Sequence, residues 1–169
     1  MKTGILLTTA LAICVSLNTA VAKSGEKEQN KAHVELTPEE LNWIKGPDSL
    51  PSGVQMVILE GHPSKAGSFT MRLKVPAHYK IPAHWHPADE HVTVLQGSMY
   101  MGMGDKLDEN QGKKLPIGSF AAIPKKMHHF AWTGGEETII QLHGNGPWGI
   151  HYLNPNDDPR KNKNNQESS

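Results

Sequence analysis

The sequence predicts a single all-β domain, a sandwich or barrel, and three observations support this prediction. From about Val54 to Leu153 the chain alternates short runs of β-forming residues with turn residues. No run in that region has the spacing of an amphipathic helix. The length of 169 residues and the hydrophobic content of 37% suffice for one core rather than two.

The first 22 residues have the pattern of a signal peptide. Lys2 is followed by an apolar run over residues 5–17, and Ala20 and Ala22 on either side of Val21 form a small-x-small cleavage signal. The apolar run is shorter than the about 20 residues that a membrane helix needs. We therefore expect cleavage after Ala22, and a secreted or periplasmic protein that has no membrane segment after cleavage.

The charge balance argues against two classes of partner. The chain has 17 basic and 17 acidic residues, and loss of residues 1–22 removes one lysine and no acid. Such a near-neutral chain lacks the electrostatic attraction that nucleic acid or an anionic membrane requires. Cys14 is the only cysteine, so the mature chain is expected to have no disulfide.

Two short segments are expected before the barrel. Residues 23–35 are polar without apolar periodicity, which predicts a flexible leader. The stretch LTPEELNWIKGP at 36–47 has a capping box and an early proline, and it ends in Gly-Pro. This pattern predicts a short helix from Pro38 to about Lys45.

The barrel domain is expected to span residues 36–153. Its β-type runs lie at 54–60, 68–75, 84–86, 90–96, 98–103, 119–124, 128–133, 137–143 and 148–153. Many short runs with turn residues between them are typical of a sandwich or barrel. Residues 154–169 are expected to form a polar tail, disordered beyond Arg160.

Histidines and an acid gather around the third and fourth runs. Alternate side chains of a strand share a face, so His84 and His86 point the same way. If the strand resumes near Glu90, this residue shares a face with the apolar Val92 and Val94. A lone carboxylate that faces a core is costly unless it is paired or bound to a cation. The pattern therefore predicts a metal site.

A further ligand is expected from the segment at 124–133. Either His128 or His129 can turn inward, because alternation forbids both from sharing one face. Periodicity alone does not choose between them, and a role for His91 also stays open.

These spacings resemble the two sequence motifs of the cupins. The first motif, G-x5-H-x-H-x3-E-x6-G, is matched at His84, His86, Glu90 and Gly97. The second, G-x5-P-x-G-x2-H-x3-N, is matched at Gly118, Pro124 and His129. The resemblance implies a double-stranded β-helix, or jelly-roll, barrel. It also favours His129 over His128 as the last ligand.

The chain departs from the two motifs at three positions. His78 and Lys126 stand where the motifs have glycine, and Thr133 stands where the second motif has asparagine. Such glycines usually serve turns with positive φ, which His and Lys adopt less readily. The departures therefore concern the turns, and they leave the four ligand types unchanged.

Three imidazoles and one carboxylate suit a divalent Fe, Mn, Ni, Cu or Zn ion. Such a set leaves room on the ion for water, substrate or dioxygen. The resemblance implies an oxidoreductase of dioxygenase type acting on a small organic molecule, with Glu90 as ligand and proton acceptor. Gln141 and His143 share a strand face and are candidates for orienting substrate, although a surface position fits them equally well.

Two other functions fit the same sequence. One is a non-enzymatic, metal-dependent binding or sensor module for a small molecule. The other is a sugar isomerase or epimerase of cupin type, which is less favoured because those activities are mainly cytoplasmic. The resemblance also implies a homodimer.

Overall fold

The protein is described by a computed structural model that covers residues 33–164. The predicted signal peptide and residues 23–32 of the predicted leader lie outside this range, as do residues 165–169. Residues 33–35, the rest of the leader, are exposed and have no regular structure. The described part of the chain contains no helix that is long and apolar enough to cross a membrane.

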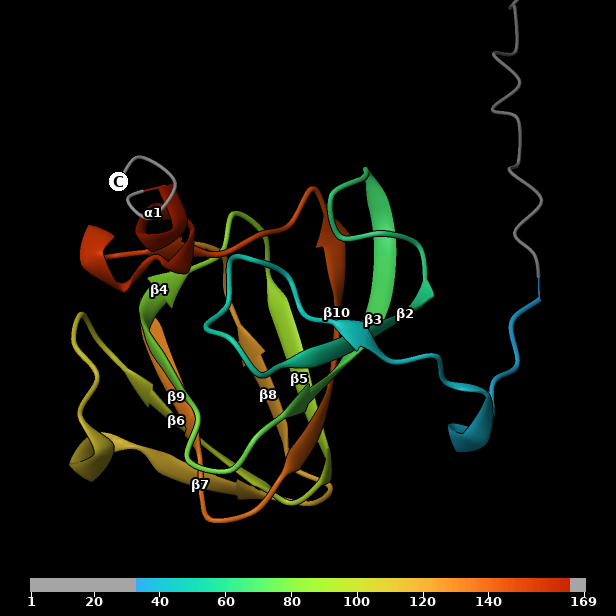
Figure 1. Ribbon diagram of the computed structural model, residues 1–169, viewed down its shortest axis with the longest axis horizontal. Helices are drawn as coiled ribbons and strands as arrows, with labels where there is room; N and C mark the ends of the chain where they lie inside the picture. The colour runs from blue at the N-terminus through green and yellow to red at the C-terminus, as the bar shows by residue number, and fades with distance from the viewer. Residues whose placement is uncertain (1–32, 165–169) are drawn as a thin grey trace, which may run out of the picture. The chain divides into compact units, whose positions relative to one another are not determined.

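Two antiparallel sheets face each other in the barrel (Figure 1). One sheet has the strand order β1-β2-β3-β10-β5-β8 and the other the order β11-β4-β9-β6-β7. The strands are β1 (Ile44–Lys45), β2 (Gln55–Glu60), β3 (Gly67–Val75), β4 (Lys80–Trp85), β5 (Glu90–Gln96), β6 (Ser98–Met103), β7 (Lys113–Pro116), β8 (Phe120–Ile123), β9 (His129–Thr133), β10 (Thr138–Gly146) and β11 (His151–Tyr152). This arrangement confirms the predicted all-β jelly roll.

The main core lies between the two sheets, where alternate side chains of each strand point inward. In β5, Val92 and Val94 are buried while Thr93 between them is half-buried, which is the predicted alternation. In β10, Ile140 and Leu142 are buried in the same core. Burial of such side chains is worth about 1.5–3 kcal/mol each, so this alternation fixes the register of the sheet.

A second, smaller cluster covers the outer face of the five-stranded sheet. Phe130 and Trp132 of β9 pack there with Ala83, and Leu107 and Leu153 lie against them. Consequently β9 is buried on both faces along its whole length.

The two positions at which the chain replaces a motif glycine keep the left-handed turn conformation. His78 has φ 57° and Lys126 has φ 63°. Gly97, which matches the first motif, has φ 69°, and a Cβ there would lie 2.5 Å from the Glu137 carbonyl oxygen. The turn geometry is therefore retained, although a non-glycine residue in this region costs about 1–2 kcal/mol.

The predicted helix from Pro38 to Lys45 is correct only at its start. A single-turn 3-10 helix, η1 (Pro38–Glu40), forms, and the Thr37 amide donates to the Glu40 carboxylate at 2.7 Å. Ile44 and Lys45 instead form β1 and pair with Met56 and Gln55. A helix this short is marginal by itself, so pairing with β2 determines the conformation of its second half.

The described residues after Leu153 have regular structure, and this includes residues 161–164, which lie beyond Arg160 where disorder is predicted. They form a 3-10 helix, η3 (Pro155–Asp157), and the helix α1 (Pro159–Asn164). The Asn154 side chain accepts from the Asn156 amide at 3.1 Å, and the Arg160 guanidinium donates to the Ile150 carbonyl at 3.2 Å. These local caps and the bond back to the barrel account for the order. A third 3-10 helix, η2 (Glu109–Gln111), precedes β7.

Candidate metal centre

The polar cluster inside the barrel draws its side chains from both sheets. His84 belongs to β4 and His129 begins β9, and both strands are in the five-stranded sheet. Glu90 begins β5 of the six-stranded sheet, and His86 lies in the link from β4 to β5. The side chains of all four residues are at least nine-tenths buried.

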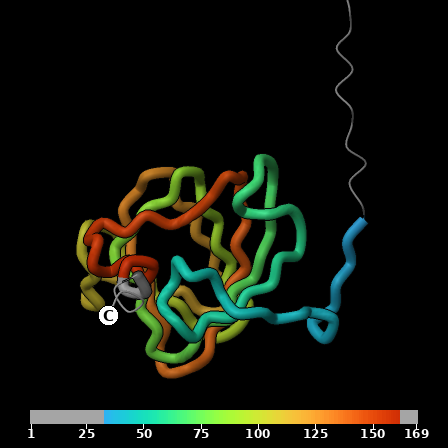
Figure 2. The backbone as a smooth tube through the Cα atoms, turned by 45° about the horizontal axis from the view of Figure 1, so that its top comes forward, coloured from blue at the N-terminus to red at the C-terminus, as the bar shows by residue number. Residues whose placement is uncertain are grey.

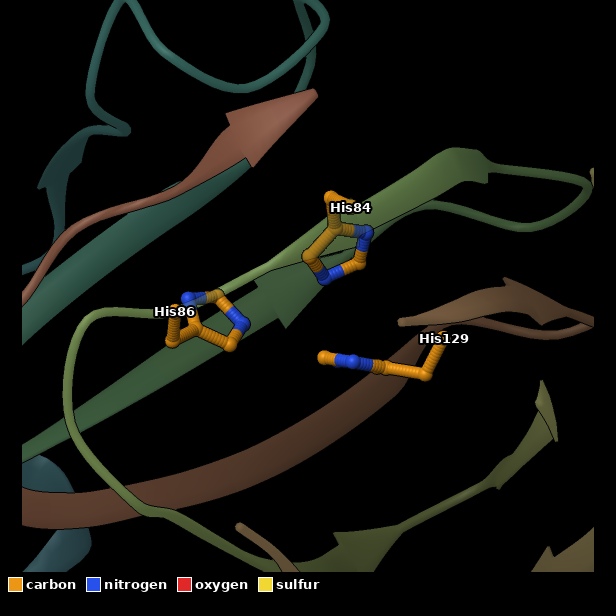
Figure 3. Close-up of side chains that lie close together, drawn as sticks. All are labelled: His84, His86 and His129. Carbon is orange, nitrogen blue, oxygen red and sulfur yellow. The ribbon is translucent and has the colours of Figure 1, made fainter. Parts of the chain in front are cut away.

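The three imidazoles converge on one point. Figure 3 shows their nitrogen atoms turned toward a common space. His84, His86 and His129 each contribute one ring nitrogen to a group of three, and these three nitrogens all lie within 4.8 Å of one another. Among the described residues this is the only group of three or more potential ligand side chains with such spacing.

Backbone carbonyls orient all three rings. Nδ1 lies 2.7 Å from the Pro82 oxygen in His84, 2.7 Å from the Gly149 oxygen in His86, and 3.1 Å from the Met127 oxygen in His129. A carbonyl oxygen only accepts, so each Nδ1 carries the proton. In the neutral rings Nε2 therefore keeps its lone pair, which is the arrangement of histidine ligands held by an outer hydrogen bond.

The Glu90 carboxylate closes the cluster. Its Oε2 lies 3.4 Å from Nε2 of His86 and 3.3 Å from Nε2 of His129. Nε2 of His86 is buried and makes no hydrogen bond to any described residue. Lone pairs that face a carboxylate at this distance require a proton or a cation between them.

The pKa values reflect this crowding. Burial, and then the neighbouring His129 and His86, lower the pKa of His84 to about 3. Burial acts to raise the pKa of Glu90, but the electrostatic effect of the neighbouring His86 and His129 outweighs it and holds that pKa below its usual range. The cluster thus favours an ionised carboxylate beside an uncharged His84, a combination that binds a divalent cation.

A cavity of about 50 Å³ adjoins the cluster, and we call it the inner cavity. Its lining residues are Pro47, Ser49, Leu50, Met71, Leu73, Ile81, His84, His86, Glu90, Leu142, Trp148 and Ile150. The Trp148 ring stacks on the His86 ring with 4.2 Å between centroids and 15° between planes. The segment at 148–149 therefore holds His86 twice, through this stacking and through the Gly149 carbonyl.

The segment at 46–54 covers one side of the inner cavity and is tied to the barrel by two tyrosines. Tyr152 donates its hydroxyl to the Ser49 carbonyl at 2.8 Å, and Tyr79 donates to the Pro51 carbonyl. Figure 2 shows the teal segment before β2 beside the red segment that follows β10. Covering segments of this kind limit the access of water to the cluster.

The structure separates the other candidate residues from the cluster. His128 is 41% exposed and pairs with Asp105 at 2.7 Å, so His129 is the histidine that turns inward. His91 lies on the outer face of β5, where its ring stacks on His143 of β10 at 4.5 Å between centroids.

Gln141 and His143, the candidates for orienting substrate, are not among the residues that line the inner cavity. Both side chains lie on the outer face of β10, because the alternating Ile140 and Leu142 fill the core. Gln141 accepts a hydrogen bond from Arg72 at 3.1 Å. The alternation of these two polar residues with Ile140 and Leu142 already allowed a surface position for both, and this is the position that they occupy.

Sequence reasoning did not identify the residues that position His86 or close the cavity. Trp148 and Gly149 follow β10, and Tyr152 lies in β11. The segment at 141–160 contains many turn-forming residues and some aromatic side chains, and this composition does not assign any of these contacts.

A two-sheet β-barrel with three histidines and a glutamate held between its sheets defines a cupin-type protein. The sequence profile described as the ChrR cupin-like domain matches residues 31–149. The chain belongs to this family. No curated protein sequence gives a significant match to it.

Solved structures with the same fold have low sequence identity to this chain. The polyketide cyclase RemF from Streptomyces resistomycificus is 16% identical, with a TM-score of 0.61 over 79% of this chain and 94% of RemF. A proposed acetylacetone dioxygenase from Methylibium petroleiphilum is 17% identical, with a TM-score of 0.56 over 78% of this chain and 88% of that protein. An RmlC-like cupin from Shewanella frigidimarina is 12% identical, with a TM-score of 0.52 over 68% and 92% of the two chains. At these identities the likeness concerns the fold alone.

Proposed function

We propose that this protein is a metal-dependent cupin that binds a small organic molecule and oxidises it in a reaction of dioxygenase type. The observation that supports the proposal is the common orientation of three imidazoles, each with Nδ1 on a backbone carbonyl and Nε2 free for a shared ion. The enzyme part draws on the similar structures, among them a cyclase and a proposed dioxygenase named for small organic substrates.

The residues have distinct roles in this proposal. A divalent Fe, Mn, Ni, Cu or Zn ion would supply a Lewis acid or redox centre with positions open to substrate. His84, His86 and His129 hold the ion as neutral ligands, because their Nδ1 protons are engaged by carbonyls. Glu90 offsets part of its charge, and it is the carboxylate beside the open space that can accept a proton from a bound ligand.

Metal analysis of adjacent histidine variants tests the metal centre. We expect about one ion per chain by elemental analysis in the unmodified protein, and loss of most of it in His129→Ala. His128→Ala is the matched control, because it makes the same change one residue away on a partly exposed side chain. Equal metal content in the two variants would contradict the proposed centre.

A second candidate function is reversible binding without turnover, as in a sensor module. The burial of all four ligands and the small volume of the inner cavity favour it. To separate the two functions, oxygen uptake is measured after phenols, diketones and thiols are added to the metal-loaded protein. Uptake of oxygen indicates turnover. If compounds stabilise the protein against unfolding but none of them is converted to a product, the result supports the second function and contradicts the first.

Export and self-association belong to the proposal as well. Residues 1–22 support export, and a mature form that begins at Lys23 is the expected result of N-terminal analysis. The homodimer is proposed on family resemblance, and light scattering on the mature protein tests it.

A further inference from the structure

The walls of the inner cavity differ sharply from its metal-facing end. Five buried aliphatic side chains line it, namely Met71, Leu73, Ile81, Leu142 and Ile150. None of the residues that line it is a lysine or an arginine, and Glu90 is its only charged side chain apart from the imidazoles. In the metal-loaded centre the ion already pairs with the Glu90 carboxylate, so a charged group on a ligand, other than one bound to the metal itself, would lie against apolar walls without a partner.

One of the lining residues has a buried polar donor without an acceptor. The indole Nε1 of Trp148 is buried and has no hydrogen-bond partner among the described residues. The ring is fixed by its stacking on His86 and by contact with Phe69 at 5.6 Å between centroids. A buried donor of this kind costs about 1–3 kcal/mol unless it is satisfied, and an indole N–H can only donate.

The size of the cavity limits the ligand further. Its volume of about 50 Å³ exceeds the about 10–15 Å³ that one buried water needs, and it corresponds to only a few such waters. The part of a ligand that lies inside the cavity is therefore limited to a handful of heavy atoms beyond its metal-bound group.

We infer that the centre selects a small ligand with an uncharged, mainly apolar body, and that Trp148 recognises it by donating its indole N–H to a ligand oxygen. This inference rests on the proposed metal centre and specifies what it binds. Sugar phosphates and nucleotide sugars bound to the metal through sugar oxygens, and dicarboxylates bound through one carboxylate, are excluded as ligands, because their remaining charged group would have no partner in the lining.

Two hydroxamic acids of nearly equal size test the selection by charge. Propionohydroxamic acid and glycine hydroxamic acid both bind metals through their hydroxamate oxygens, but the second has an ammonium group in place of the terminal methyl. The full chain is loaded with Zn²⁺, its metal content is measured, and both affinities are determined by calorimetry. Each affinity is divided by the affinity of the same probe for free Zn²⁺. We expect glycine hydroxamic acid to bind at least about tenfold more weakly.

Trp148→Phe tests the recognition by the indole, because it keeps an aromatic ring to stack on His86 and removes the N–H donor. We expect unchanged zinc content and an affinity for propionohydroxamic acid that is about threefold to tenfold weaker. The affinity for 1-propanethiol, which binds zinc without an oxygen acceptor, should not change. Trp85→Phe is the matched control, because Trp85 follows His84 on β4 and stacks on His151 instead.

The outcomes separate the inference from the proposal beneath it. An unmodified chain that takes up no metal overturns both. A zinc-loaded chain that binds the charged and uncharged probes equally overturns the selection by charge. A Trp148→Phe variant that binds propionohydroxamic acid as tightly as the parent, or loses both oxygen and sulfur probes alike, overturns the assigned role of Trp148.

Discussion

Thr133 provides the sharpest stability prediction, because it stands where the second cupin motif has asparagine and it is 3% exposed. Its hydroxyl donates to the Pro76 carbonyl at 2.6 Å and accepts from the Tyr79 amide at 2.9 Å. These bonds clamp both ends of the turn that contains His78 in its left-handed conformation. The strand β4, which contains His84, begins directly after this turn.

Replacing Thr133 by valine removes both hydrogen bonds and keeps the shape of the side chain. The Tyr79 amide and the Pro76 carbonyl then lose a partner, and each unsatisfied buried group costs about 1–3 kcal/mol. We expect the free energy of unfolding to fall by about 2–4 kcal/mol. Urea unfolding of the chelator-treated protein measures it without a contribution from bound metal.

Thr133→Ser is the control, because serine keeps both hydrogen bonds and loses one methyl group, worth about 1 kcal/mol or less. If the valine variant is as stable as the serine variant, the two hydrogen bonds do not stabilise the turn in the way that we infer.

Three other predictions follow from the structure. Lys126→Gly should leave stability unchanged or raise it by up to about 1 kcal/mol. Glycine adopts φ 63° without steric cost, and the greater conformational entropy of glycine in the unfolded chain offsets part of this gain. A clear loss of stability in urea unfolding would contradict this prediction. The chelator-treated protein should lose stability as the pH falls from about 6.5 to 3, by up to about 1.4 kcal/mol per pH unit. The reason is that the pKa of His84 is about 3 in the folded protein, so that within this range the unfolded chain binds a proton that the folded chain does not. Urea unfolding midpoints that stay constant over this range would refute the prediction. The Gln141→Ala and His143→Ala variants should keep their full metal content in elemental analysis, because both side chains lie on the outer face of β10. Loss of metal in either variant would contradict this and indicate that the residue contributes to the metal centre.

The strands were predictable because the barrel has one strong physical signal, the alternation of buried and exposed side chains. Each predicted run corresponds to a strand, although β4 begins at Lys80 and is longer than expected. Two strands were missed. β1 has only two residues, and β7 (Lys113–Pro116) combines two lysines with a proline at the edge of its sheet, where neither β propensity nor alternation is visible.

The choice between His128 and His129 shows where alternation fails. The rule assumes one polar face and one apolar face, but β9 is buried on both. Phe130 and Trp132 fill the outer cluster, so their apolar character did not indicate the direction of the main core. The family spacing identified the inward histidine because it reflects the geometry of the barrel rather than the polarity of the strand.

The surroundings of the cluster were harder to predict than its ligands for a different reason. The imidazoles and the covering segment are positioned largely by backbone carbonyls, those of Pro82, Met127, Gly149, Ser49 and Pro51. Every residue type has a carbonyl, so these contacts leave no mark in the sequence. The ligand types are visible because only a few side chains bind metals, whereas ring orientation and cavity size depend on where loops cross the barrel. For this reason substitutions in the segments at 46–54 and 147–150 can change what the centre binds while the four ligand side chains stay the same.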